Sequence, residues 1–179
     1  MKAWNHFCTI THHKFLVMKS CFRVGLYKQG LLHDLSKYSW TEFRVGAKYF
    51  QGNYSPNNAE KADKGLSLSW LHHKGRNKHH FEYWIDYPAG GNGVLSGMKM
   101  PNRYIVEMVM DRIAASKVYL KGEYTDASAL NYYNRSRERL KPVLHPHTRE
   151  LLELLLNMLA AQGEVATFAY IRKNISYKE

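Results

Sequence analysis

Apolar residues recur along most of the chain at the three- and four-residue spacing of helices that bury one face. No segment alternates apolar and polar residues convincingly enough to predict a strand, and no internal repeat is evident. We therefore expect an all-α fold. The predicted helices are 6–29, 31–37, 40–50, 59–73, 79–85, 101–121, 127–140, 147–161 and 164–173.

Local residues set the ends of these helices. Gly30 is placed to terminate the first helix, and Pro101 is placed to begin helix 101–121. Ser39 and Glu42 have the spacing of a capping box at the start of helix 40–50. The segment 87–100 holds one proline and four glycines, which is typical of an irregular surface loop that rims a site.

The length of 179 residues suits one domain with its own core, and 45% hydrophobic residues argue against disorder. The stretch 142–146 is a connector rather than a boundary. We expect one all-α domain over 1–179, with the metal-site motifs in 13–111 and additional C-terminal helices in 126–175.

The cysteines and apolar stretches favour a cytoplasmic protein. Cys8 and Cys21 fall on one predicted helix, where about 1.5 Å of rise per residue separates them by roughly 20 Å, too far for a disulfide. Residues 1–11 lack the apolar segment of a signal peptide, and 151–161 is too short to span a bilayer. We expect reduced thiols and no membrane partner.

The charge balance predicts an anionic partner. Lys and Arg number 26 against 15 acidic residues, a net charge of +11. A phosphorylated small molecule such as a nucleotide fits this balance. Nucleic acid is less favoured, because the basic cluster 135–149 comes without a helix-turn-helix, zinc-finger or RNA-binding motif and is better explained as a solvated face.

The most informative motif is His33-Asp34 followed by Lys37. The pair offers one nitrogen and one oxygen ligand to a single ion, and Lys37 at i+3 from Asp34 can reach the same pocket. A metal with a cation beside it suits a phosphate. The alternative is a pair of core residues hydrogen-bonded to their neighbours.

Further histidines and a carboxylate follow an order that gives the motif a context. His12 and His13 precede it, four histidines at 72, 73, 79 and 80 follow it, and Asp111 lies in an otherwise apolar helix. A carboxylate there is costly unless paired, so it is either a ligand or a partner of Arg112 or Lys117. The four histidines could instead form a solvated basic patch.

This order, His, then His-Asp, then histidines, then Asp, resembles the HD-domain superfamily of metal-dependent phosphohydrolases, whose metal ligands run H…HD…D. His-Asp-x-x-Lys at 33–37 is a frequent form of the family's central motif. The block 70–84 also resembles the signature of an uncharacterised bacterial family within or near that superfamily. The resemblance implies an all-α fold and hydrolysis of a phosphate ester or phosphoanhydride.

The resemblance also implies a ligand set. A first metal would be held by His33, Asp34, Asp111 and a histidine of the first helix, for which we choose His13 because His12 points about 100° away. A second metal would use histidines from 72–73 and 79–80. Spacing of i and i+7 pairs His73 with His80 and His72 with His79, and we favour His73 and His80. One or two divalent ions, Fe, Mn, Zn or Co, suit these ligands.

The resemblance to the HD-domain superfamily also implies roles in catalysis. Asp34 would orient a water or bridge two metals, and Lys37 would neutralise phosphate charge. Candidate substrate-binding residues are Lys14, Arg44, Lys74 and Arg76. Two alternatives remain: an HD-type di-iron oxygenase, and a non-catalytic protein that binds a nucleotide or nucleic acid.

Overall fold

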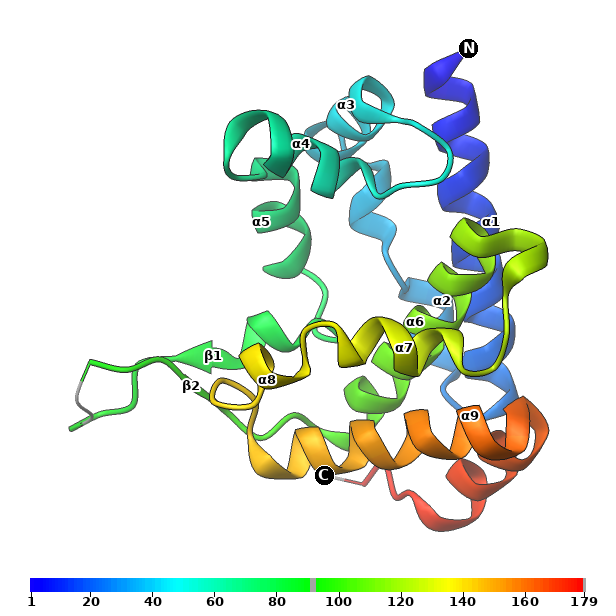
Figure 1. Cartoon of the computed structure of the whole chain (residues 1–179), viewed down its shortest axis with the longest axis vertical. Coiled ribbons are helices and arrows are strands. Elements are labelled where there is room, and N and C mark those ends of the chain that lie inside the picture. The colour runs from blue at the N-terminus through cyan, green and yellow to red at the C-terminus, as the bar shows by residue number, and fades with distance from the viewer. Residues whose placement is uncertain (91–92, 179) are drawn as a thin grey trace.

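The computed structural model describes residues 1–90 and 93–178, and the fold is all-α, as predicted (Figure 1). Short 3₁₀ turns at Leu35–Tyr38, Phe81–Trp84 and Lys121–Glu123 join some of the helices. The helices are α1 (Lys2–Arg23), α2 (Tyr27–Leu32), α3 (Trp40–Tyr49), α4 (Pro56–Lys64), α5 (Leu68–Lys74), α6 (Asn102–Leu120), α7 (Ser128–Asn134), α8 (Arg137–Leu140) and α9 (Pro146–Asn174).

A small antiparallel ribbon interrupts this helical pattern, in a region where no strand is predicted. Strand β1 (Ile85–Asp86) pairs with β2 (Ser96–Gly97), with Ile85 opposite Gly97. The ribbon projects away from the helices in Figure 1. Two-residue strands are too short to leave an alternating pattern in the sequence, so the prediction of an irregular loop over 87–100 is only partly right.

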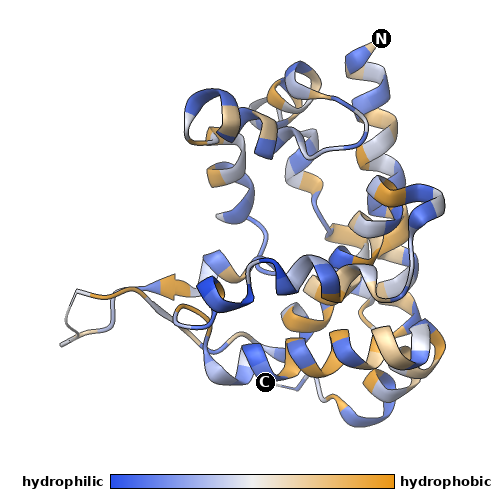
Figure 2. Cartoon of the chain, in the orientation of Figure 1, coloured by the Kyte–Doolittle hydropathy of each residue, from blue (hydrophilic) through white to orange (hydrophobic). Residues whose placement is uncertain are grey.

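One apolar core joins α1, α6, α7 and α9. α6 packs between α1 and α9, and α7 also contacts both α6 and α9. Figure 2 shows apolar segments gathered where α6 and α9 lie together. The core therefore includes helices from both ends of the chain. Its fully buried members include Val17 and Cys21 of α1, Ile105, Val109 and Met110 of α6, Tyr133 of α7, and Leu152, Leu155, Leu156 and Leu159 of α9.

Helices α3, α4 and α5 form a second group, which packs on α1 (Figure 1). α3 contacts α1, α4 and α5, and the long α1 spans both groups. Its buried face, which includes His6, His13 and Val17, is thus shared between α3 and α6. This arrangement brings residues of α1, α3, α5 and α6 close together.

Several helix ends differ from the predicted ones at glycines with positive φ. α1 ends at Arg23, because Gly25 takes φ +82°, a value that favours glycine. Gly30 is therefore not a terminator; it lies buried inside α2. Gly65, with φ +76°, divides the predicted helix 59–73 into α4 and α5.

The break predicted between helices 147–161 and 164–173 is confirmed: both lie within α9, and Gly163 between them has non-helical backbone angles (φ 77°, ψ 177°). The predicted helix 127–140, in contrast, is divided into α7 and α8. That short interruption carries no apolar periodicity of its own, so the pattern alone could not locate it.

The cysteines and α9 bear on the expected localisation. Cys8 is exposed, Cys21 is buried, and both are free, as predicted. Within the described residues, α9 is the one helix long and apolar enough to cross a membrane. Leu152, Leu155 and Leu159 of this helix have no exposed surface and pack in the core, and about a third of its most apolar stretch is buried.

His6 predicts a pH dependence of stability that is separate from the candidate site. Its ring packs against Phe43 and Phe50, with centroids 5.4 and 6.0 Å away, and Gly46 makes room for it. Burial, aided by the charge of Lys37, lowers the pKa of His6 from 6.5 to about 4. The unfolded chain therefore takes up this proton first as the pH falls from 6.5 towards 4, and folding stability falls with it.

We expect the melting temperature to decline less steeply over that pH range in His6→Gln than in the unaltered protein. The exposed neighbour His12 gives the control His12→Gln, which should retain the full decline. Equal declines in all three proteins, measured by circular dichroism at pH 7.0 and 4.5, would contradict this account of His6.

Candidate metal centre

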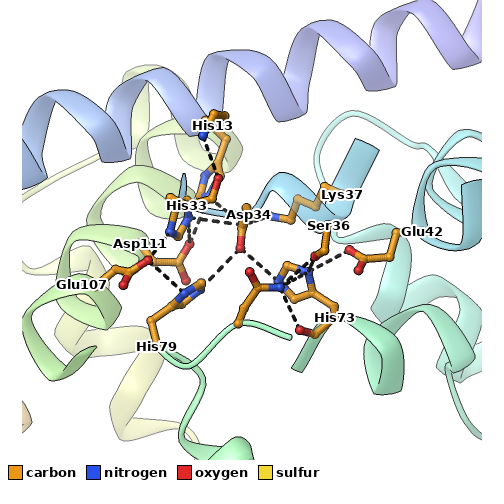
Figure 3. Close-up of polar contacts among 12 residues, drawn as sticks. His13, His33, Asp34, Ser36, Lys37, Glu42, His73, His79, Glu107 and Asp111 are labelled. Atoms are coloured by element: carbon orange, nitrogen blue, oxygen red, sulfur yellow. Dashed lines mark hydrogen bonds and ion pairs between the residues drawn. The ribbon is translucent and has the colours of Figure 1, made fainter. Parts of the chain in front are cut away.

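The His33-Asp34 pair lies at a sharp bend, not on a helix as predicted. α2 ends at Leu32; His33 has φ −51° and ψ 126°, and Asp34 has left-handed angles of φ 53° and ψ 26°. Asp is among the few non-glycine residues that enter this region readily. The two side chains are buried, and Figure 3 shows them among residues of α1 and α6.

Lys14 of α1 stabilises this bend. Its ammonium donates hydrogen bonds to the carbonyl oxygens of Leu31 (2.7 Å) and His33 (2.9 Å), groups that the end of α2 leaves without helical partners. Lys14 was predicted to bind substrate. In the structure its ammonium instead hydrogen-bonds the backbone of residues 31 and 33 beside the candidate metal centre.

The structure brings together the four residues predicted for a first metal. Nε2 of His13 lies 3.0 Å from Oδ1 of Asp111 and 3.7 Å from Oδ2 of Asp34. Nε2 of His33 lies 3.2 Å from the same Asp34 oxygen and 3.5 Å from Asp111 Oδ1. Donor atoms about 2.1 Å from one ion, at tetrahedral or octahedral angles, are about 3.0–3.5 Å apart, so these spacings suit a shared ion.

A second cluster lies on the other side of Asp34. Its Oδ1 is 3.3 Å from Nε2 of His73 and 3.5 Å from Nε2 of His79, and His80 completes the group. The four ligand atoms lie within 4.8 Å of one another. His73 and His80 were predicted here, and the structure adds His79.

Asp34 is therefore common to both clusters, through different oxygens. Oδ2 faces His13 and His33, and Oδ1 faces His73 and His79 (Figure 3). A carboxylate that presents one oxygen to each of two ions can bridge them. This geometry is what the bridging role predicted for Asp34 would require, and the role itself stays a prediction.

The unsatisfied polar atoms of the core are concentrated at these clusters. Among the described residues, both Asp34 oxygens and Nε2 of His13, His33, His79 and His80 are buried and have no hydrogen-bond partner. Buried polar atoms are rarely left unpaired, because each costs about 1–3 kcal/mol. These atoms approach one another without donor–acceptor geometry, which is the arrangement of ligands around a cation. The clusters could thus hold metal ions.

Two outer carboxylates orient the imidazoles. Oε1 of Glu107 lies 2.9 Å from Nδ1 of His33 and 3.2 Å from Nδ1 of His79. Glu42 contacts Nδ1 of His73 through Oε2 (2.8 Å) and Nδ1 of His72 through Oε1 (2.7 Å). An ionised carboxylate only accepts, so each Nδ1–H donates and Nε2 is the ring nitrogen that each ligand turns towards an ion.

The carboxylates of the site are held ionised. Burial alone would raise the pKa of Asp34, but His33, Lys37 and His73 hold it well below the usual range. Burial likewise opposes ionisation of Asp111, but other influences, led by hydrogen bonds from His13 and His33, lower its pKa well below the usual range. Both groups are therefore available as anionic ligands at neutral pH.

The pKa values of His33 and His13 shift in opposite directions. Burial lowers the pKa of His33, but the Asp34 charge and the contacts of its ring nitrogens with the accepting carboxylates of Asp111, Asp34 and Glu107 outweigh it and raise the pKa well above the usual range. Burial lowers the pKa of His13, helped by Lys37. A neutral His13 is ready to ligate, whereas a proton on His33 must leave before a metal can bind.

The predicted cation of the site is in place. Nζ of Lys37 lies 2.5 Å from Oδ2 of Asp34, and about a quarter of its side chain is exposed. Burial is the largest influence and lowers the pKa of Lys37, but the charges of Asp34 and Asp111 reverse this and raise it, so the ammonium is retained. A protonated amine cannot ligate a metal.

The other candidate residues lie elsewhere. Arg44 is exposed on α3, and Lys74 is half-buried at the end of α5. Arg76 is exposed and donates to the carbonyl oxygen of His72 at 3.4 Å. No described contact joins any of the three to the two clusters, and their roles in substrate binding stay predictions.

Sequence reasoning considered His79 without favouring it, and it missed Glu42 and Glu107 as residues of the site. His79 stood beside His80, but helical spacing favoured His73 with His80 and the turn at residues 75–77 changes that geometry. Glu107 was detectable, because it lies one helical turn before Asp111 in an apolar run. Glu42 was misread as part of a capping box.

The capping box itself does not form. Helix α3 begins at Trp40 as predicted, but the side chain of Ser39 makes no capping hydrogen bond. The Glu42 carboxylate is directed instead at His72 and His73. Both roles require an acidic residue near the start of the helix, so spacing alone cannot distinguish them.

Comparison with known proteins yields a family. A family model described as a family of unknown function (DUF5662) matches residues 2–158, a span that contains every residue of both clusters. Comparisons with curated proteins and with solved structures give no match. The match covers well over half of the 179 residues, and the chain therefore belongs to this family of unknown function, DUF5662.

Proposed function

We propose that this protein is a cytoplasmic metal-dependent phosphohydrolase with two divalent ions, of the HD type, acting on a phosphate ester or phosphoanhydride. The observation that carries the proposal is Asp34, whose two oxygens face two separate groups of ligands, His13, His33 and Asp111 on one side and His73, His79 and His80 on the other. A bridged pair of ions is a recurrent device for displacement at phosphorus.

Each candidate residue has a distinct role in this proposal. His13, His33, Asp34 and Asp111 would hold one ion, and Asp34, His73, His79 and His80 the other. When bound, such ions polarise phosphoryl oxygens and make water nucleophilic near neutral pH. Asp34 fixes the spacing of the two sites, and Lys37 presents a positive charge beside them to an anionic substrate.

The ligand chemistry narrows the choice of ion. Imidazole nitrogens predominate, and carboxylates supply the remaining ligands, a combination that suits Fe, Mn, Zn or Co rather than Ca or Mg. The net charge of +11 favours encounter with a phosphorylated small molecule such as a nucleotide.

A di-iron oxygenase is the second candidate, favoured by the three imidazoles of the cluster with His73, His79 and His80. The two functions differ in what they consume. Iron in the purified protein together with substrate-dependent uptake of O₂ would favour the oxygenase. Release of phosphate without O₂ uptake would favour hydrolysis.

The test begins with metal content. Protein purified without chelator or a metal-affinity step should contain about two ions per chain, because two ligand sets share Asp34 and a third candidate group, His33, His79 and Glu107, only reuses their histidines. His80→Ala should lower the ratio towards one, since the cluster that contains His13 is left intact. His12→Ala is the matched control, because His12 is exposed beside His13 and belongs to neither cluster.

Elemental analysis of the three proteins decides this. A ratio near zero in the unaltered protein, with none gained after incubation with Mn²⁺, Co²⁺, Zn²⁺ or Fe²⁺, would overturn the proposal. A ratio of one that His80→Ala does not change would restrict it to a single ion. Phosphate release from a panel of phosphorylated compounds then tests the activity.

A further inference from the structure

Glu107 occupies a special position between the two clusters. It is buried on α6, one helical turn before the ligand Asp111. A single oxygen, Oε1, lies 2.9 Å from Nδ1 of His33 and 3.2 Å from Nδ1 of His79. Those two histidines belong to different clusters, so one carboxylate oxygen orients one ligand of each (Figure 3).

We propose that Glu107 is a positioning residue that couples the two metal sites, so that both ions bind tightly only when this carboxylate holds His33 and His79 together. The proposal rests on the proposed two-ion site. An ion at the first site fixes the His33 ring, which places Glu107 Oε1 for His79. The second ion then meets an imidazole that is already oriented, and the same holds in the reverse order.

Glu42 is an internal control for Glu107, because it contacts a histidine of only one cluster. It also accepts from a ligand imidazole, at 2.8 Å from Nδ1 of His73, and it is also buried. Its second partner, His72, belongs to neither cluster. Glu42 therefore supports the second site alone, whereas Glu107 supports both.

Asp34 also joins the sites, and the comparison separates its effect from that of Glu107. Asp34 is unchanged in both Glu107→Gln and Glu42→Gln. Any influence that passes from one ion to the other through Asp34 is therefore present in both variants. Only the influence that passes through Glu107 differs between them.

The experiment measures Co²⁺ binding to chelator-treated protein by equilibrium dialysis, with visible and paramagnetic resonance spectra to distinguish one-ion from two-ion forms. Glu107→Gln should raise the dissociation constants of both ions by roughly 10- to 100-fold, the usual cost of losing an outer-shell partner. Glu42→Gln should raise the second by a similar factor and leave the first within about threefold.

Three outcomes would overturn the coupling role: Glu107→Gln weakening one ion only, Glu107→Gln weakening neither, or Glu42→Gln weakening both equally. If Glu107→Gln does not fold, by circular dichroism of the metal-free protein, Glu107→Asp keeps the charge but withdraws the oxygen, and it should weaken both ions likewise. Binding of fewer than two ions to the unaltered protein would instead reject the two-ion site itself.

Discussion

Replacing Asp34 by glycine is expected to remove both ions and all metal-dependent turnover. Asp34 belongs to both clusters and faces one through Oδ2 and the other through Oδ1. Its loss leaves three ligands at each site and no bridge, and it removes the negative charge that two dications need nearby. Metal content should fall from about two per chain to near zero.

Glycine is the better replacement for backbone reasons. Asp34 has φ 53°, a left-handed conformation that glycine adopts freely and alanine resists by about 1–2 kcal/mol. Asp34→Gly and Asp34→Ala should therefore lose metal equally but differ in stability, with Asp34→Gly the more stable. Thermal unfolding of the two metal-free proteins measures that difference.

The charge of Asp34 also bears on the metal-free fold. The surroundings hold its pKa well below the usual range, despite burial, so the ionised carboxylate stabilises the folded state above that range. Metal-free Asp34→Gly should therefore melt below the unaltered protein. Retention of two ions and full phosphohydrolase activity in either variant would contradict the bridging role.

The ligands that the sequence identified share a clear physical signal. Asp111 is a carboxylate in an apolar helix, and His33-Asp34 with Lys37 forms a recognisable motif. A buried charged group must be compensated, so such residues stand out even without a structure. The all-α fold was predictable for a related reason, since apolar spacing records which face of each helix is buried.

What the sequence did not reveal depends on backbone bends and long-range contacts. Asp34 was assigned to a helix, yet α2 ends at Leu32 and Asp34 has a left-handed backbone. The contact between Glu42 and His73 joins α3 to α5 across 31 residues, and that between Glu107 and His33 spans 74. Neither separation follows a helical period, so only the packed structure could pair them.

Removing the ammonium of Lys37 is expected to leave metal content unchanged and to weaken turnover strongly. Lys37 lies beside Asp34 but has no lone pair to offer an ion. A lost charge-assisted contact to phosphate is worth about 1.5–3 kcal/mol, which corresponds to about a 10- to 150-fold fall in kcat/KM. Lys28→Ala, an exposed lysine on α2, is the matched control and should change neither quantity.

Substrates that differ in charge provide a stricter test of the role of Lys37. A phosphate monoester carries more negative charge than a diester, so Lys37→Ala should impair p-nitrophenyl phosphate more than bis-p-nitrophenyl phosphate, if both are hydrolysed. Lys37→Arg should recover part of the loss because it keeps the charge. An equal loss on both substrates would mean that Lys37 acts by holding Asp34. Loss of metal from Lys37→Ala would mean that the ion pair with Asp34 maintains the whole site.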